Sequence, residues 1–357
     1  MNGSQSRSGF TLVELLVIVG VLVAAALVLL PAIQRSRENG RKTNCVNNMK
    51  QIGLAMQNFE SNRKAFPASS AYDPTGKAIP GKWGHSCLTF LLPYYCGNVL
   101  YHEMKLDANP DPTVLTLASG EAAPGQYTKM SMFICPSYDG KLFRSETTAP
   151  GVRPPFGPIS NYKAIGAAQQ SSLAVATGGK APYGTASEHP DGMIYPGKGT
   201  KLADCIDGTA NTVVACETVE EVFAVWCEGR YASLAGLPDA VTIDTSRRLA
   251  NHYYPTGYQL NKFDEEADYG GMVSYLDYAF KNAPPTATAG RYDATAWIGS
   301  HNYVYGPSSR HPGAVNHVFA DGHVASIAKQ ADLALYMFAI TRASGDSERW
   351  HDPDCCR

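Results

Sequence analysis

Apolar and polar residues divide the first sixty positions of the chain into two patterns. Residues 15–30, LLVIVGVLVAAALVLL, contain no charged side chain, and the apolar stretch starts at Phe10. As a helix with a rise of about 1.5 Å per residue, this stretch is long enough to cross a hydrocarbon core of about 30 Å. A helix that is apolar on every face is unusual in a soluble domain, so the pattern predicts a membrane span.

Beyond Pro31 the pattern stays helical but becomes amphipathic. Apolar residues recur at intervals of three and four, with polar residues between them: Val46, Met49, Ile52, Met56 and Phe59. One stripe of this kind predicts that the helix continues into a globular head and packs on a sheet there. The helix is expected to end between Glu60 and Asn62, before the sequence AFP. We interpret the stripe as core rather than as a binding groove.

From Arg63 onward the chain changes to short apolar runs separated by residues rich in glycine and proline. The segments NTVVACETV (211–219) and EVFAVWCEG (221–229) are rich in β-branched and aromatic residues, which favours strands. Glycine-rich polar connections at 170–200 and 280–290 are typical of inserted surface loops. The fold class predicted is α+β, with a long N-terminal helix packed on a β-rich head that contains an antiparallel sheet.

A β-hairpin is predicted near the C-terminus. The runs VNHVFA and HVASI flank Asp321-Gly322, a dipeptide that favours a two-residue type I′ turn. Such a turn pairs Phe319 with Val324 and Val318 with Ala325. Both faces of this hairpin would carry apolar side chains, so it is expected to be buried.

Charge and cysteine content narrow the functional classes. The net charge is −2 and charged residues make up 17% of the chain, without zinc-finger spacing or a long basic stripe, so nucleic acid is not an expected partner. The nine cysteines include no C-x-x-C, and their spread suits an exported domain with some disulfides. Buried reduced cysteines remain the alternative.

A single acid, Glu14, stands inside the apolar run. A carboxylate at the centre of a bilayer costs about 2.5–3.5 kcal/mol on insertion scales, so Glu14 needs a partner if this segment spans a membrane. A cleaved secretory signal would have a shorter apolar region and a more basic start than MNGSQSRSG, whose one basic residue is Arg7. An ordinary anchor that tolerates one acid is the second alternative.

The segment GFTLVELL resembles the class III signal of type IV prepilins and type II secretion pseudopilins. The resemblance implies that a prepilin peptidase removes the leader 1–9 by cutting between Gly9 and Phe10, and that Phe10 is then N-methylated. It also implies that Glu14 pairs with the new terminal ammonium of a neighbouring subunit. An opposite charge of this kind would compensate a buried acid.

A second resemblance involves His311, Asp321 and Gly322, which form a His-x9-Asp-Gly pattern. With the prepilin-like start, it resembles a family of prepilin-type proteins of unknown function that is abundant in planctomycete bacteria. Five further segments resemble that family: NCVNNMKQIGLAMQNFES (44–61), FICPS (133–137), SNY (160–162), DGTANTVVACE (207–217) and HPGAVNHVFADGHV (311–324). The implied organisation is a leader at 1–9, a transmembrane and stalk helix at 10–62, a pilin-like extracytoplasmic head at 63–330 and a tail at 331–357.

The function implied is that of a pseudopilin-like structural subunit, not an enzyme. Its partners would be the prepilin peptidase, the lipid bilayer and other pilin-like subunits that contact the N-terminal helix. It would cross the inner membrane once, with its head in the periplasm or on the cell surface. The basic cluster Arg35, Arg37, Arg41 and Lys42 favours the opposite orientation by the positive-inside rule, but the prepilin motif fixes a cytoplasmic leader.

The alternative function is a membrane-anchored binding module that uses the prepilin signal only for export. Its site would lie in loops that carry aromatic residues, namely Tyr195, Trp226, Tyr253 and Tyr254. No nucleophile–base arrangement or phosphate loop is evident, so catalysis is not expected.

One histidine-rich region is a candidate for metal binding, because it contains His301, His311, His317 and His323 beside Asp321. Their spacings of ten, six and six lack the i, i+4 pairing of helical zinc motifs, so no metal site and no cofactor are assigned. His311 is instead expected to cap or hydrogen-bond a neighbouring loop, and Asp321 to serve the turn. A structural calcium ion, as related pseudopilins bind, is left open without assigned ligands.

Overall fold

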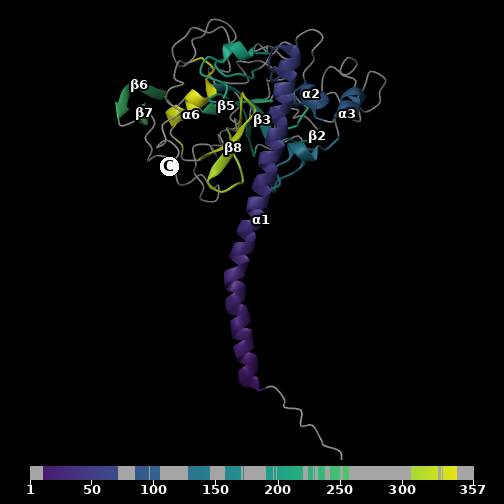
Figure 1. Ribbon diagram of the computed structural model, residues 1–357, viewed down its shortest axis with the longest axis vertical. Coiled ribbons are helices and arrows are strands. Elements are labelled where there is room, and N and C mark those ends of the chain that lie inside the picture. Colours follow the sequence, from purple (N-terminus) through teal and green to yellow (C-terminus); the bar gives the residue numbers. More distant parts are fainter. Residues whose placement is uncertain are drawn as a thin grey trace, which may run out of the picture.

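The structure of the chain is a computed structural model. It describes residues 11–70, 85–95, 97–104, 128–144, 157–169, 172, 190–195, 197, 199–219, 224–227, 229, 232–237, 242–249, 252–256, 307–328, 331 and 333–343. These residues form an α+β fold in which one long helix rises into a head built on a five-stranded sheet (Figure 1). The predicted fold class is confirmed.

Helix α1 (Leu12–Arg63) is continuous over 52 residues, with Pro31 inside it. It begins with a capping box between Thr11 and Glu14, and it ends at Lys64, whose φ of 60° lies in the left-handed region. The predicted end was therefore correct to within one residue of Asn62. By length and composition, α1 is the one helix in the described part of the chain that could cross a membrane.

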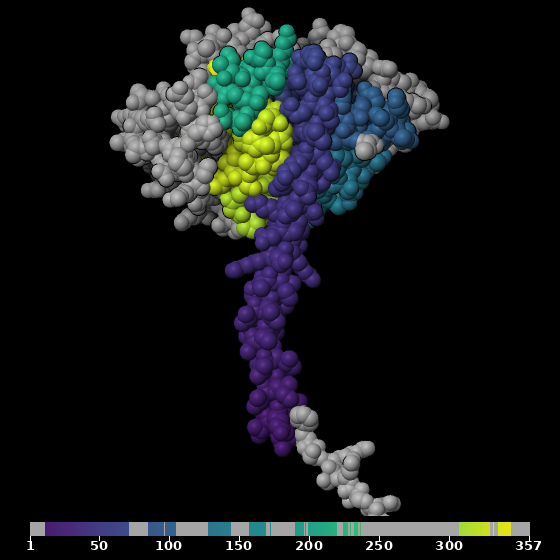
Figure 2. Space-filling model, viewed as in Figure 1, coloured from purple at the N-terminus to yellow at the C-terminus, as the bar shows by residue number. Residues whose placement is uncertain are grey.

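The two halves of α1 differ in what surrounds them. The apolar side chains of the first half, from Leu12 to Ile33, are exposed, and Figure 2 shows this part standing clear of the head. In the second half Met49, Ile52 and Met56 are buried. The predicted stripe is thus core, and its flanking positions Val46 and Phe59 are half-buried.

The main sheet has the strand order β5 (Ser233–Leu237), β3 (Tyr162–Gln169), β4 (Val213–Glu217), β8 (Ala314–Phe319) and β9 (Val324–Ala328). It is mixed rather than purely antiparallel, because β3 and β5 run parallel while the other neighbours are antiparallel. The predicted strand at 211–219 is confirmed as β4. In the described part of 221–229, only Val225 makes an isolated bridge, to Ile159, so the expected strand is absent there.

Smaller elements complete the head. Two strand pairs are β1 (Phe143–Arg144) with β2 (Gly157–Pro158), and β6 (Thr242–Leu249) with β7 (His252–Thr256). The short helices are α2 (Cys87–Leu91), η1 (Leu92–Tyr94), α3 (Asn98–Glu103), η3 (Ser131–Phe133) and η4 (Leu202–Asp204). Helix α1 contacts α2 and η1 on one side and the β8–β9 hairpin on the other, as Figure 2 shows.

Helices cover both faces of the sheet. Helix α1 packs on one face, and α6 (Leu333–Ile340) packs on β3, β4 and β5 from the other. Successive side chains of β8 point to opposite faces of the sheet. Val318 belongs to the core on the α1 side, whereas Val315 and Phe319 belong to the core on the α6 side. The head therefore continues beyond residue 330, the boundary expected from the sequence, because α6 is one of its core elements.

The predicted hairpin is present, but its turn and register differ from the expectation. Val318 pairs with Val324 and His317 with Ala325, a shift of one residue. Gly322 has a φ of 89°, and no positive φ occurs at Asp321. The loop is therefore a three-residue turn that ends in a left-handed glycine, rather than a type I′ turn. Strand β8 is buried, whereas β9 lies at the edge of the sheet and is only partly buried. The expectation that the whole hairpin is buried was therefore wrong for β9.

Candidate functional site

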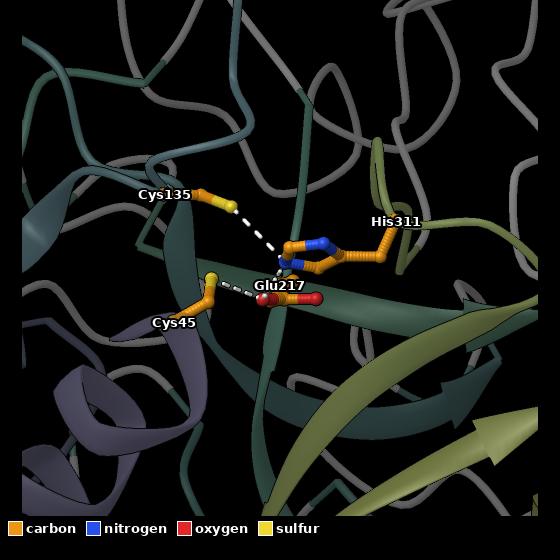
Figure 3. A group of neighbouring side chains, drawn as sticks. All are labelled: Cys45, Cys135, Glu217 and His311. Atoms are coloured by element: carbon orange, nitrogen blue, oxygen red, sulfur yellow. Dashed lines mark hydrogen bonds and ion pairs between the residues drawn. The ribbon is translucent and has the colours of Figure 1, made fainter. Parts of the chain in front are cut away.

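Four side chains from distant parts of the sequence meet where α1 joins the head. They are Cys45 in the middle of α1, Cys135 in the loop after η3, Glu217 at the end of β4 and His311 just before β8 (Figure 3). One sulfur, nitrogen or oxygen atom from each lies within 4.8 Å of those of the other three. All four residues are buried, with exposed fractions between 0% and 5%. We refer to Cys45, Cys135, Glu217 and His311 as the junction cluster.

His311 uses both ring nitrogens and connects the junction cluster to Glu38. Its Nδ1 lies 2.7 Å from Oε1 of Glu38, a residue of α1. Its Nε2 lies 3.4 Å from Sγ of Cys135 and 3.5 Å from Oε1 of Glu217. Since Glu38 can only accept while it is ionised, Nδ1 carries a proton and donates it there. Nε2 is the nitrogen that faces the thiol and the buried carboxylate.

Glu217 is held in place by the neighbouring strand. The backbone N–H of Asn316 donates to Oε2 at 3.1 Å, and its side-chain amide donates to Oε1 at 3.0 Å. The thiol of Cys45 also donates to Oε1, at 2.5 Å. Glu217 reaches the α1 face because β4 contains a bulge between Val213 and Ala215, which places Val213 and Cys216 in the α6-side core.

The two thiols are positioned by α1 and by a tight loop. Cys45 lies on the buried stripe of α1, four residues before Met49, and its Sγ is 3.0 Å from the hydroxyl of Tyr162. The backbone N–H of Cys135 donates to Oδ1 of Asn161 at 3.0 Å. Two residues further on, the hydroxyl of Ser137 donates to Glu38 at 2.9 Å, so the same loop also orients the partner of His311.

In the junction cluster, burial and close hydrogen-bonding partners shift the pKa values in opposite directions. Burial disfavours the charged form of His311, but contacts with Cys135, Glu217 and Glu38 outweigh it and raise its pKa to about 10. Burial likewise acts to raise the pKa of Glu217, yet its bonds from His311, Cys45 and Asn316 lower it overall. The close contacts of Cys135 with Cys45 and His311 outweigh its burial and lower its pKa to about 6.

Both ends of the His-x9-Asp-Gly pattern contact α1. His311 binds Glu38, while the turn that contains Asp321 and Gly322 lies against Gly53, where a Cβ would come within 2.7 Å of the Gly322 carbonyl oxygen. One helical turn later, Gln57 donates its side-chain amide to the carbonyl of Ala320. His311 thus contacts a neighbouring loop, through Cys135, and also hydrogen-bonds the stalk helix, through Glu38.

Asp321 stabilises the hairpin turn, as the sequence predicts. Its Oδ1 accepts the backbone N–H of His323 at 3.0 Å and lies 2.6 Å from Nδ1 of the same residue. The described histidines of this region, His311, His317 and His323, do not converge on one point. His317 is buried on the α6 side, with Nε2 at 2.9 Å from the hydroxyl of Tyr336, and His301 lies outside the described residues.

At the N-terminus, Gly9 and Phe10 also lie outside the described residues. Glu14 is the third residue of α1, and its Oε2 accepts the backbone N–H and the hydroxyl of Thr11, both at 2.9 Å. The acid therefore has a local partner at the start of the helix, where unpaired N–H groups favour a carboxylate.

Two further expectations concern cysteines and aromatic residues. The described cysteines are all free and buried, so the described part of the chain shows no disulfide: Cys45, Cys87, Cys135, Cys205, Cys216 and Cys227. Tyr195 and Trp226 are buried core residues rather than members of an exposed aromatic patch. The side chains of Tyr253 and Tyr254 lie outside the description.

Of the four members of the junction cluster, only His311 was predicted from the sequence as a candidate, and the other three were missed. A signal was present, because each of the missed residues lies in a segment on which the family resemblance was based. Cys45 belongs to NCVNN, Cys135 to FICPS and Glu217 to VVACE, while SNY contributes Tyr162 and Asn161. Spacing alone could not join them, since 172 positions separate Cys45 from Glu217.

Fold and site together define a stalk-and-head protein in which a buried polar cluster joins one long helix to a mixed sheet. The chain belongs to the family described as "Protein of unknown function (DUF1559)", whose model matches residues 34–334. The match includes all four members of the junction cluster, and it starts after the apolar half of α1. None of the curated proteins and none of the solved structures matches the chain.

Proposed function

We propose that this protein is a pseudopilin-like structural subunit. It is anchored in the inner membrane by the first half of α1, holds its head outside the cytoplasm, and assembles with similar subunits through that helix. Processing by a prepilin peptidase releases residues 1–9. The subunit serves a filament or an envelope complex of the type II secretion or type IV pilus kind, and it carries out no catalysis.

The observation that carries this proposal is the division of α1. One unbroken helix presents only apolar side chains over Leu15–Leu30 and leaves them uncovered, yet the same helix is embedded in the head from Cys45 to Met56. A soluble protein would cover such a surface, because exposed apolar patches of this size favour association. A bilayer, or the helices of neighbouring subunits, would cover it instead.

Glu14 supports assembly through this helix. A carboxylate can accept about four hydrogen bonds, and the capping box uses Oε2. Acceptor capacity therefore remains for an ammonium group, which cleavage after Gly9 would create on Phe10.

The first experiment is N-terminal mass spectrometry of the protein extracted from membranes of its native host. We expect a mature chain that starts with N-methylated Phe10. Gly9→Glu should leave the leader uncut while the protein still enters the membrane. A mature chain that keeps Met1, or normal processing of Gly9→Glu, would contradict the proposal.

The second experiment separates anchoring from assembly. Glu14→Val should be inserted and processed, but cross-linking between helices of neighbouring subunits should be lost. Leu22→Val is a matched control at an exposed apolar position of the same helix and should cross-link normally. Equal cross-linking of Glu14→Val and the control would refute the pairing role of Glu14.

A further inference from the structure

We propose that the junction cluster binds one zinc ion, with Cys45, Cys135, Glu217 and His311 as its four ligands. The site would be structural, since all four positions around the metal are filled by protein atoms, and it would fasten the stalk helix to the head. This inference does not depend on the pseudopilin proposal.

The spacing of the donor atoms suits tetrahedral coordination. With Zn–S bonds of about 2.3 Å and Zn–N or Zn–O bonds of about 2.0–2.1 Å, ligand atoms around zinc lie about 3.3–3.8 Å apart. Nε2 of His311 lies 3.4 Å from Sγ of Cys135 and 3.5 Å from Oε1 of Glu217. The separation of 2.5 Å between Sγ of Cys45 and Oε1 of Glu217 would increase by about 1 Å as the ion replaces the thiol proton.

The identity of the donors selects the class of metal. Two sulfurs, one imidazole nitrogen and one carboxylate oxygen form a set that suits zinc, a borderline-soft ion. Calcium and magnesium prefer six or more oxygen ligands, which this cluster cannot offer. The arrangement therefore differs from the calcium site left open by the sequence analysis.

The residues around the donors have the roles that a metal site requires of its surroundings. Glu38 accepts the Nδ1 proton of His311 at 2.7 Å, which fixes the tautomer whose Nε2 is free to bind a metal. Asn316 donates twice to Glu217, and the hydroxyl of Tyr162 lies 3.0 Å from the Cys45 sulfur. Three of the four proposed ligands thus have a dedicated partner that orients them.

Protons and charge balance in the proposed binding step. Zinc binds both sulfurs as thiolates and Nε2 of His311 without its proton, so the protons that these atoms carry go to solvent, and His311 keeps one proton, on Nδ1. Two thiolates, one carboxylate and Zn²⁺ leave a net charge of −1 on the cluster, next to Glu38. The Asn316 amide, the Tyr162 hydroxyl and Arg41, which lies 2.8 Å from Glu38, face this negative charge.

One small pocket in the described part of the head is the starting point for an entry path to the junction cluster. The pocket borders the junction cluster and is lined by Cys135, Glu217 and the segment Ser308–Arg310. A metal site that can be loaded after folding needs such a path, because its ligands are otherwise buried.

The rival account is a metal-free ionic network in which protonated His311 lies between Glu38 and Glu217. Both accounts need the histidine and the carboxylates, but only the zinc site needs two thiols. Tests on Cys45 and Cys135 therefore distinguish the accounts more sharply than tests on His311.

The primary experiment uses the full-length chain, purified in detergent under reducing conditions. Elemental analysis should find about one zinc per chain, and X-ray absorption should find two sulfur ligands at about 2.3 Å. Removal of the metal with a chelator should lower the melting temperature of the head, and added Zn²⁺ should restore it. A chain that takes up no zinc after metal addition, that binds calcium instead, or whose zinc has fewer than two sulfur ligands would overturn the proposal.

The variants Cys45→Ser and Cys135→Ser should each reduce the bound zinc to well below one per chain. Cys216→Ala is the matched control, because Cys216 is also buried and free but belongs to the core on the α6 side. If the control loses zinc to the same extent, or if protein from the native host contains a Cys45–Cys135 disulfide, the proposal is wrong. If a serine variant fails to fold, the sulfur count of the wild-type protein decides the question.

Discussion

The two faces of the central sheet are built from neighbouring residues but are stabilised in different ways. On the α6 face, Val315 and Phe319 pack with α6 in an almost entirely apolar core. On the α1 face, the junction cluster adds two thiols, one carboxylate and an imidazole to the apolar contacts of Met49 and Met56. Adjacent strand residues are sorted between these environments by alternation and by one bulge in β4.

Two buried histidines show what this difference does to chemistry. His311, on the α1 face, is surrounded by Glu38, Glu217 and Cys135, which raise its pKa to about 10 despite its burial. Burial lowers the pKa of His317, on the α6 face, to about 4. The α1 face thus accommodates charge, and would accommodate a cation, whereas the α6 face excludes it.

The largest expected effect is the loss of a charged group on the α1 face. Glu217→Ala would leave Nε2 of His311 and the Asn316 amide buried without the carboxylate that faces them, so the free energy of unfolding should fall by about 3–5 kcal/mol. Cys216→Ala, one residue away on the opposite face, removes only a buried thiol and should cost about 1–2 kcal/mol.

Urea unfolding of the two variants, followed by the fluorescence of the buried Trp226, would measure this difference. Equal losses would mean that the polar contacts of Glu217 stabilise the head no more than ordinary packing does.

The second effect is a pH dependence that originates on the α6 face. Because the pKa of His317 falls from 6.5 to about 4 on folding, the unfolded chain binds more protons between these values. The contribution of neutral His317 is therefore fully present above pH 6.5 and is lost as the pH falls towards 4, by about 3 kcal/mol in total.

The measurement is the stability of the wild type and of His317→Leu/Tyr336→Phe at several pH values between 7 and 4. The second substitution removes the hydroxyl that the first would leave without its partner. The double variant should be less sensitive to acid than the wild type. Identical pH profiles would show that His317 does not titrate on unfolding in this range.

Periodicity predicted much of this architecture because it reports local physics. The stripe of Met49, Ile52 and Met56 identified the embedded half of α1, and the Asp321-Gly322 turn located the β8–β9 hairpin. The exact register was wrong, because a dipeptide does not determine whether two or three residues form the loop. The short helix α6 was missed, since its eight nearly all apolar residues show no amphipathic period.

The junction cluster could be predicted only in part, for a different reason. Cys45, Cys135 and Glu217 come together only through tertiary contacts between the sheet and α1. In the sequence, the residues around each of them have the pattern of an ordinary buried segment. The bulge in β4 that places Glu217 on the α1 face is invisible in an alternating strand sequence. Motif spacing around His311 emphasised nearby histidines, but the two that the structure describes, His317 and His323, do not join it.

The smallest expected effects concern how closely each helix approaches the sheet. At Gly53 of α1, an added Cβ would meet the carbonyl oxygen of Gly322 at 2.7 Å, and at Gly236 of β5 it would come still closer to Cδ1 of Ile340. Backbone cannot move aside easily, but the tip of an isoleucine can rotate. Gly53→Ala should therefore cost about 1–3 kcal/mol, and Gly236→Ala less, despite the shorter distance.

Gly40→Ala provides the control for helix propensity, because nothing lies within 4 Å of its added methyl group. Alanine is favoured over glycine in a helix by about 1 kcal/mol, so Gly40→Ala should stabilise α1 slightly while Gly53→Ala destabilises the head. Melting temperatures of the three variants in detergent would rank them. If Gly236→Ala proved more harmful than Gly53→Ala, the α6 face would be the more rigid one, and the close contact between α1 and the His-x9-Asp-Gly turn would not be what limits the position of the stalk.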